Sequence, residues 1–190
     1  MARIVISENV SLDGVVQDPS GAEGFARGGW VGLVTDREEP GKVLLDEALT
    51  SEALLLGRRT YAFFAARWPS RDGELADSLN TLTKYVVSST LEAADWNNST
   101  VLRGDVVREV SELKRQLDGD IVVYGSLQLV RTLMEHGLAD ELRLMVYPVV
   151  LGAGERLFGE TDDARPLRLV DARTLGDSVA LLVYQPVRGG

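Results

Sequence analysis

The stretch that decides the fold is residues 121–130, Ile-Val-Val-Tyr-Gly-Ser-Leu-Gln-Leu-Val. Its first four residues form an apolar run rich in β-branched side chains, which predicts a buried strand. Gly125 and Ser126 follow, and a helical pattern begins at Leu127. The first turn of a helix leaves backbone N–H groups without partners inside the helix, and the helix dipole adds partial positive charge. This junction therefore suits a phosphate group, although a tight turn with Ser126 as helix N-cap is the alternative.

A second junction of this kind lies at Gly57. Residues 53–56 read as a short buried strand, and Arg58, Arg59 and Thr60 then open a helical pattern. Two cations at a helix N-terminus are unfavourable against the dipole, which hints at a role in binding an anion; solvated charges at the start of the helix are the alternative. Together the two junctions predict a nucleotide cofactor and therefore an enzyme.

Composition excludes several classes of protein. The chain has 190 residues, 45% of them hydrophobic and 26% charged, which is ordinary for a single globular domain. It has no cysteine and one histidine, so disulfides, thiolate metal sites and His-rich metal sites are excluded and no metal is expected. The net charge of -9 argues against a nucleic-acid partner. No signal peptide opens the chain, and the longest apolar run is too short to span a membrane, so a cytoplasmic protein with no membrane partner is expected.

Strand and helix patterns alternate along most of the chain and predict an α/β fold. The C-terminal part differs, because residues 167–175 and 179–187 flank Gly176-Asp177-Ser178 and predict a β-hairpin. We expect a three-layer αβα sandwich whose mixed, mostly parallel sheet ends in this antiparallel hairpin, in one domain over residues 1–190. The loop at residues 18–30 holds four glycines and is predicted to be mobile, with Trp30 either closing over a site or anchoring the loop. The predicted strands are 3–10, 53–56, 85–88, 100–102, 121–124 and 142–150, and the predicted helices are 42–50, 60–66, 72–82, 105–117 and 127–136.

Six motifs occur in a characteristic order along the chain. They are Ser11-Leu12-Asp13-Gly14, Gly57-Arg58-Arg59-Thr60-Tyr61, Tyr85-Val86-Val87-Ser88-Ser89, Tyr124-Gly125-Ser126, Leu138-Ala139-Asp140-Glu141-Leu142 and Pro148-Val149-Val150-Leu151-Gly152-Ala153-Gly154. In this order and spacing the chain resembles the dihydrofolate reductase-like superfamily, and specifically the reductase domain of riboflavin biosynthesis. The resemblance covers nearly the whole chain and implies a dihydrofolate reductase-like fold.

The resemblance also implies NADPH as the hydride donor. Arg58 and Arg59 would meet its 2′-phosphate or pyrophosphate, and Thr60 would bond the pyrophosphate from the start of its helix. The other cofactor-binding residues that the resemblance implies are Gly57, Ser88 and Ser89 near the adenosine, and Tyr124, Gly125, Ser126 and Leu127 around the pyrophosphate. The family often has a second glycine where this chain has Ser126, whose side chain would either bond a phosphate or crowd it.

Two carboxylates are candidates for the chemistry. The resemblance puts Asp13 at the substrate end of the cofactor, to bind substrate or relay a proton, whereas the plain alternative is an aspartate that ends a strand before the Gly14 turn. Dihydrofolate reductases carry a carboxylate on the helix before the Gly-Arg-x-Thr strand. Here that helix offers Asp46 and Glu47, with Asp36 upstream, and Asp46 is the candidate that we take forward.

The expected activity is NADPH-dependent reduction of 5-amino-6-(5-phosphoribosylamino)uracil, a small-molecule substrate of riboflavin biosynthesis. Reduction of a pterin, a folate or another small carbonyl or imine is the alternative within enzymes. An NADPH-binding relative without turnover is the alternative from another class. The resemblance implies a homodimer, and a stand-alone reductase is expected because the zinc ligands of a deaminase domain are missing from the sequence.

Overall fold

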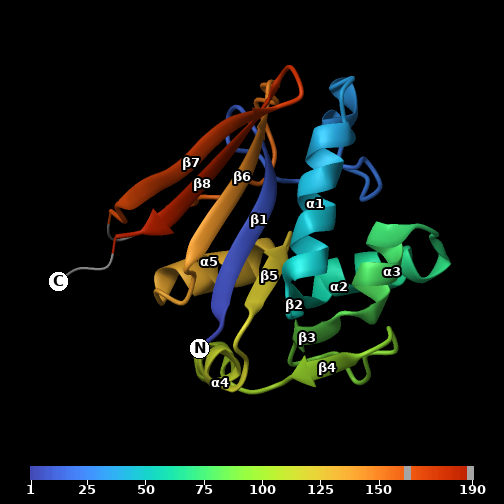
Figure 1. Cartoon of the computed structure of the whole chain (residues 1–190), viewed down its shortest axis with the longest axis vertical. Coiled ribbons are helices and arrows are strands. Elements are labelled where there is room, and N and C mark those ends of the chain that lie inside the picture. The colour runs from blue at the N-terminus through green and yellow to red at the C-terminus, as the bar shows by residue number, and fades with distance from the viewer. Residues whose placement is uncertain (161–163, 188–190) are drawn as a thin grey trace. The chain divides into compact units, whose positions relative to one another are not determined.

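The computed structural model describes residues 1–160 and 164–187. The chain divides into two compact units, residues 1–6 with 42–140 and residues 7–41 with 141–190. The strand order is β4-β3-β2-β5-β1-β6-β8-β7 in one eight-stranded sheet, in which β1 (Arg3–Ser11) is common to both units (Figure 1). The predicted α/β class with a mixed sheet is therefore confirmed.

The first unit contains the parallel strands. They are β2 (Ala53–Gly57), β3 (Thr83–Val87), β4 (Ser99–Leu102) and β5 (Asp120–Tyr124). β2 pairs in parallel with both β3 and β5, and β3 pairs with β4. These strands are short and mostly apolar, as expected where helices cover both faces of a parallel sheet.

Five helices accompany these strands: α1 (Glu38–Thr50), α2 (Arg58–Ala65), α3 (Glu74–Thr81), α4 (Val106–Gln116) and α5 (Leu127–Glu135). A short 3-10 helix, η2 (Trp68–Ser70), follows α2. The predicted N-cap of α4 is confirmed, because Asp105 accepts a hydrogen bond from the Arg108 N–H at 2.9 Å. One buried cluster joins alternate strand residues to α1, α2 and α3; it comprises Ala48, Leu54, Leu56, Tyr61, Leu79, Val86, Trp96, Val122 and Tyr124.

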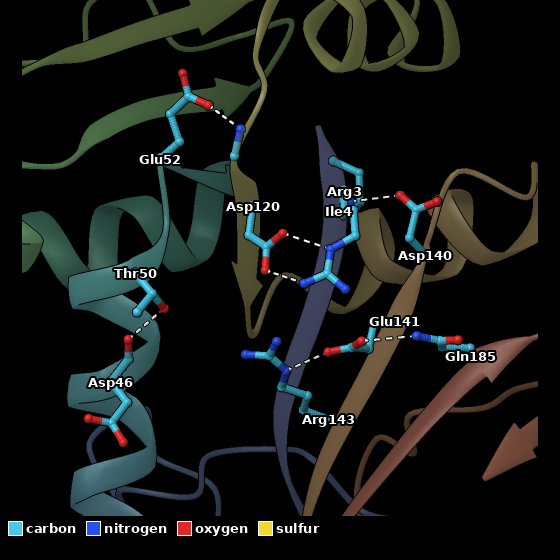
Figure 2. Close-up of polar contacts among 11 residues, drawn as sticks. Arg3, Ile4, Asp46, Thr50, Glu52, Asp120, Asp140, Glu141, Arg143 and Gln185 are labelled. Carbon is cyan, nitrogen blue, oxygen red and sulfur yellow. Dashed lines mark hydrogen bonds and ion pairs between the residues drawn. The ribbon is translucent and has the colours of Figure 1, made fainter. Parts of the chain in front are cut away.

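Polar contacts fix the ends of the first unit's strands. The Arg3 guanidinium forms two hydrogen bonds with the Asp120 carboxylate, at 2.8 and 2.6 Å, and so joins β1 to the start of β5 (Figure 2). Asp140 accepts a bond from the Ile4 N–H at 2.8 Å. The two aspartates therefore set where these strands begin.

The second unit contains the antiparallel strands β6 (Glu141–Tyr147), β7 (Leu167–Leu175) and β8 (Val179–Pro186). β8 pairs with both β6 and β7, which confirms the predicted hairpin. Gly176 has φ +61°, and a Cβ there would lie 2.4 Å from Asp36 Oδ2, so only glycine fits this turn. Glu141, buried on β6, accepts bonds from Arg143 at 2.8 Å and from Gln185 at 3.3 Å (Figure 2).

The glycine-rich loop at residues 18–30 differs from the prediction of a mobile segment. Asp18 is buried, and its carboxylate accepts bonds from the Glu23 and Phe25 N–H groups, both at 3.1 Å. Trp30 begins the 3-10 helix η1 (Trp30–Leu33), donates its ring N–H to the Gln17 carbonyl at 2.9 Å and packs edge-on against Tyr147. Trp30 is therefore a loop anchor. Gly28 serves close packing, since a Cβ on it would lie 2.4 Å from Asp18 Oδ2.

Candidate functional site

The two strand-to-helix junctions of the first unit lie against each other. The Gly57 N–H donates to Ser126 Oγ at 2.9 Å, and the Ser126 N–H donates to Thr60 Oγ1 at 2.8 Å. Ser126 Oγ in turn donates to the Tyr124 carbonyl at 2.9 Å. Residues 57–60 and 124–127, which we call the paired junction, are thus linked through the Ser126 and Thr60 side chains.

The strand register explains why these junctions meet. Ala53 pairs with Ile121 and Leu54 with Val122 in parallel β2 and β5, so four residues further on Gly57 follows the same row as Gly125. The carboxyl ends of parallel strands lie at one edge of a sheet, where open α/β proteins bind their ligands. Gly125 has φ +52°, and a Cβ on it would approach Thr60 Oγ1 to 3.0 Å. A glycine is therefore required for the junctions to approach so closely.

The paired junction uses some of the N–H groups that the sequence assigns to a phosphate. The N–H groups of Gly57 and Ser126 are already bonded to hydroxyl oxygens. The N–H of Leu127 has no acceptor inside α5, because it belongs to the first turn. The Thr60 hydroxyl accepts from Ser126 and keeps its own proton to donate. A phosphate here would therefore meet Thr60 and the start of α5, with the Ser126 side chain tying the two junctions together.

The arginine and serine candidates border the same edge. Arg58 and Arg59 begin α2 and are exposed. Gly57 pairs with Val87, so Ser88 and Ser89 follow β3 directly beside the paired junction. The Ser88 hydroxyl is buried and accepts bonds from the Thr90 and Leu91 N–H groups, at 3.2 and 3.0 Å. It therefore shapes its own turn, whereas Ser89 is exposed.

Ser126 supplies a direct test of the paired junction. We expect Ser126→Ala to lower the free energy of unfolding by about 2 kcal/mol, because the Gly57 N–H loses its acceptor. Urea unfolding measures the change. Ser111→Ala is the matched control, since the Ser111 hydroxyl donates only to the Val107 carbonyl one helical turn earlier. An equal loss in the two variants would contradict the linking role of Ser126.

Asp13, in the second unit, is the anchor of the loop after β6. Its carboxylate accepts bonds from the Ser11 hydroxyl at 2.7 Å and from the Leu151 and Gly152 N–H groups at 3.0 and 2.8 Å. These bonds lower the pKa of Asp13 to about 2, those from Leu151 and Ser11 most strongly. Arg27 donates to the Leu151 carbonyl and strengthens the same attachment. Asp13 is thus held ionised, which opposes the predicted role in relaying a proton.

Acid should release this anchor. The pKa of Asp13 is about 2 in the folded chain against an ordinary 3.8, so its contribution to stability is present above pH 3.8 and is lost as the pH falls toward 2. We expect Asp13→Asn to be less stable than the wild type at neutral pH, with the difference shrinking across that acid range. Unfolding midpoints measured against pH test this. Asp177→Asn, in the hairpin turn, is the control and should show no such convergence.

Asp46 and Glu47 differ sharply although they are neighbours on α1. Asp46 is exposed, and its carbonyl accepts a bond from the Thr50 hydroxyl at 2.7 Å (Figure 2). Glu47 is buried and accepts a bond at 3.1 Å from the hydroxyl of Tyr124, the first residue of the 124–127 segment of the paired junction. Of the two acids, Glu47 is thus the one whose side chain is buried and hydrogen-bonded within the first unit. A catalytic role for Asp46 stays a prediction.

Two further features bear on the class of protein. Within residues 1–160 and 164–187, no group of three His, Cys, Asp or Glu side chains is arranged to hold a metal ion. None of the helices in this described part is both long and apolar enough to cross a bilayer.

The chain is similar in sequence and in fold to several known proteins. The chain is 29% identical over 187 residues to the uncharacterized protein YyaP of Bacillus subtilis (strain 168), which covers 96% of this chain and 94% of YyaP. Its fold is similar to a putative riboflavin biosynthesis protein from Shewanella sp. PV-4, with a TM-score of 0.77 and 19% identity over 99% of this chain and 100% of that one. It is also similar to Enterococcus faecalis dihydrofolate reductase complexed with NADP(H) and RAB-propyl, with a TM-score of 0.58 and 16% identity over 97% and 96% of the two chains. The fold is therefore dihydrofolate reductase-like. Since residues 2–181 match the family model described as the RibD C-terminal domain, the chain belongs to that family.

Proposed function

We propose that this protein is an NADPH-dependent reductase of a small heterocyclic substrate, with 5-amino-6-(5-phosphoribosylamino)uracil as the first candidate. The observation that carries the proposal is the paired junction, where three adjacent parallel strands end beside two exposed arginines. Membership of the RibD C-terminal domain family supports the class of reaction. The Enterococcus faecalis enzyme, whose fold is similar, is complexed with NADP(H).

The residues of the paired junction fit the phosphates of such a cofactor. The Thr60 hydroxyl and the first N–H groups of α5 are donors, and the α5 dipole favours a negative charge beside them. Arg58 and Arg59 are exposed guanidinium groups that suit bidentate contacts to a 2′-phosphate. The chain's net charge of -9 repels anions at long range, so this local set of donors must supply the attraction.

The cofactor would supply a hydride to the carbon of a C=N bond, and the nitrogen would take up a proton to give an amine. The chain's own task is to bind both molecules and fix their orientation. Asp13 accepts bonds from two backbone N–H groups, and these lower its pKa, so the proposal assigns the proton to a source other than Asp13. Asp13 is therefore proposed to act through the loop that it anchors.

The test has two stages with separate outcomes. NADPH binding is first measured by calorimetry, and loss of the reduced-nicotinamide absorbance is then followed with the ribosylaminopyrimidine, a pterin and simple imines. Binding together with consumption on the ribosylaminopyrimidine supports the proposal. Consumption only on a pterin or an imine supports the alternative substrate classes. Binding without consumption supports a relative that lacks turnover, and absence of binding contradicts the proposal.

A further inference from the structure

The Ser126 hydroxyl already occupies hydrogen-bonding groups of the paired junction. It accepts a bond from the Gly57 N–H and donates its own proton to the Tyr124 carbonyl, both at 2.9 Å. A hydroxyl has a single proton, so Ser126 Oγ has only lone-pair capacity left for any further partner. Gly57, Thr60 and Ser126 are all half-buried, so a ligand from solvent can reach this arrangement.

Ser126 does not cap the helix that it precedes. It is the N-cap residue of α5, yet within the described residues its side chain accepts no hydrogen bond from that helix. Asp105, at the same position before α4, does accept one from its helix. Ser126 also has φ +56° and ψ +40°, a left-handed conformation that costs free energy for a residue with a Cβ. Its side chain is therefore explained by the bond that it makes to the neighbouring junction.

A ligand phosphate and the Ser126 hydroxyl compete for the same donor. Phosphate oxygens need N–H or O–H donors, and the Gly57 N–H at the start of α2 is one. While Ser126 Oγ accepts from that N–H, a phosphate cannot take its place, and Ser126 has no proton left to donate to the anion. The junction of the free chain therefore offers a phosphate one donor fewer than its backbone could supply.

We propose that Ser126 is an internal latch, whose hydroxyl stands in for a ligand oxygen on the Gly57 N–H and must be displaced when a diphosphate binds there. The latch lowers the affinity of the junction for any diphosphate. It acts equally on NADPH and NADH, because the two carry the same diphosphate, and it is separate from the 2′-phosphate contact proposed for Arg58 and Arg59. The inference rests on the proposed reductase function for the identity of its ligand.

The test compares diphosphate binding with the exchange of one amide proton. Ser126→Gly removes the hydroxyl together with the Cβ, and Ser126→Ala removes the hydroxyl alone. Asn98→Gly is the matched control, because Asn98 also has φ +56° and its side chain donates to the Thr81 carbonyl at 2.7 Å, away from the paired junction. Calorimetry measures the affinity for NADPH, NADH and inorganic pyrophosphate. Hydrogen exchange of the Gly57 N–H, followed by NMR, reports the latch without any ligand.

We expect both Ser126 variants to bind all three ligands about fivefold more tightly than the wild type, because no internal bond has to be broken. The ratio of NADPH to NADH affinity should stay the same, and Asn98→Gly should bind within about twofold of the wild type. The Gly57 N–H should exchange about tenfold faster in both Ser126 variants.

The outcomes separate the latch from the proposed reaction. If the Ser126 variants bind pyrophosphate more tightly but the wild type consumes no NADPH, the reaction fails and the latch stands. Diphosphate binding that is weaker, unchanged or absent in both Ser126 variants overturns the latch, whether or not the wild type is an active reductase. An unchanged exchange rate of the Gly57 N–H in both variants overturns it as well.

Discussion

Replacing both Arg58 and Arg59 with alanine is expected to weaken NADPH binding by about 100-fold. Each charge-assisted hydrogen bond to a phosphate contributes about 1.5–3 kcal/mol, and exposure of both side chains places the pair near the lower end. NADH lacks the 2′-phosphate, so its affinity should fall much less. Calorimetric titration of both dinucleotides measures the two changes, and the ratio between them reports the preference for NADPH.

The control for this double variant is Arg108→Ala combined with Arg115→Ala, which removes the same charge from α4 and leaves the paired junction intact. It should leave both affinities within about twofold of the wild type. The wild-type affinity for NADPH should also decrease with salt more steeply than that of the double variant. Equal losses for NADPH and NADH in the Arg58 and Arg59 variant would contradict a 2′-phosphate contact and favour contact with the shared pyrophosphate.

The parts of this fold that the sequence predicted correctly depend on neighbours in the chain. An apolar β-branched run followed by Gly125 predicts both the end of a strand and the start of a helix. Asp105 predicts a helix N-cap without reference to any distant residue. The hairpin around Gly176 follows in the same way. That the two junctions lie close together follows from a further rule, that the carboxyl ends of parallel strands lie at one edge of the sheet.

The predictions that the structure revises depend on partners far away in the sequence. From the sequence, Ser126 is a helix N-cap or a side chain that bonds or crowds a phosphate, yet its oxygen accepts a bond from the N–H of Gly57, 69 positions away. Asp13 reads as a catalytic candidate, yet it bonds the backbone of Leu151, 138 positions away. Hydrogen bonds of this kind require the register between distant elements, which no local pattern contains.

Replacing Lys84 with methionine is expected to lower the free energy of unfolding by about 3 kcal/mol at pH 7. Lys84 is fully buried on β3, and its ammonium donates to the carbonyls of Asn80, Leu82 and Asn97 at 3.0, 2.7 and 2.9 Å. It also lies 4.3 Å from the centre of the Trp96 ring. Methionine keeps the length of the side chain but leaves the three carbonyls without this donor, at about 1–3 kcal/mol each. That loss exceeds the relief of no longer burying a charge.

The pH dependence separates this role of Lys84 from simple packing. Burial lowers the pKa of Lys84 from 10.5 to about 8, so between these values the folded chain holds fewer protons than the unfolded chain. The wild type should therefore gain stability, by up to about 3 kcal/mol, as the pH rises through this interval. Lys84→Met should lack that gain, while Lys42→Met, at an exposed position of α1, should keep it. Urea unfolding of the three proteins at both ends of the interval measures the slopes. Parallel slopes for wild type and Lys84→Met would contradict a Lys84 ammonium whose pKa is lowered by burial.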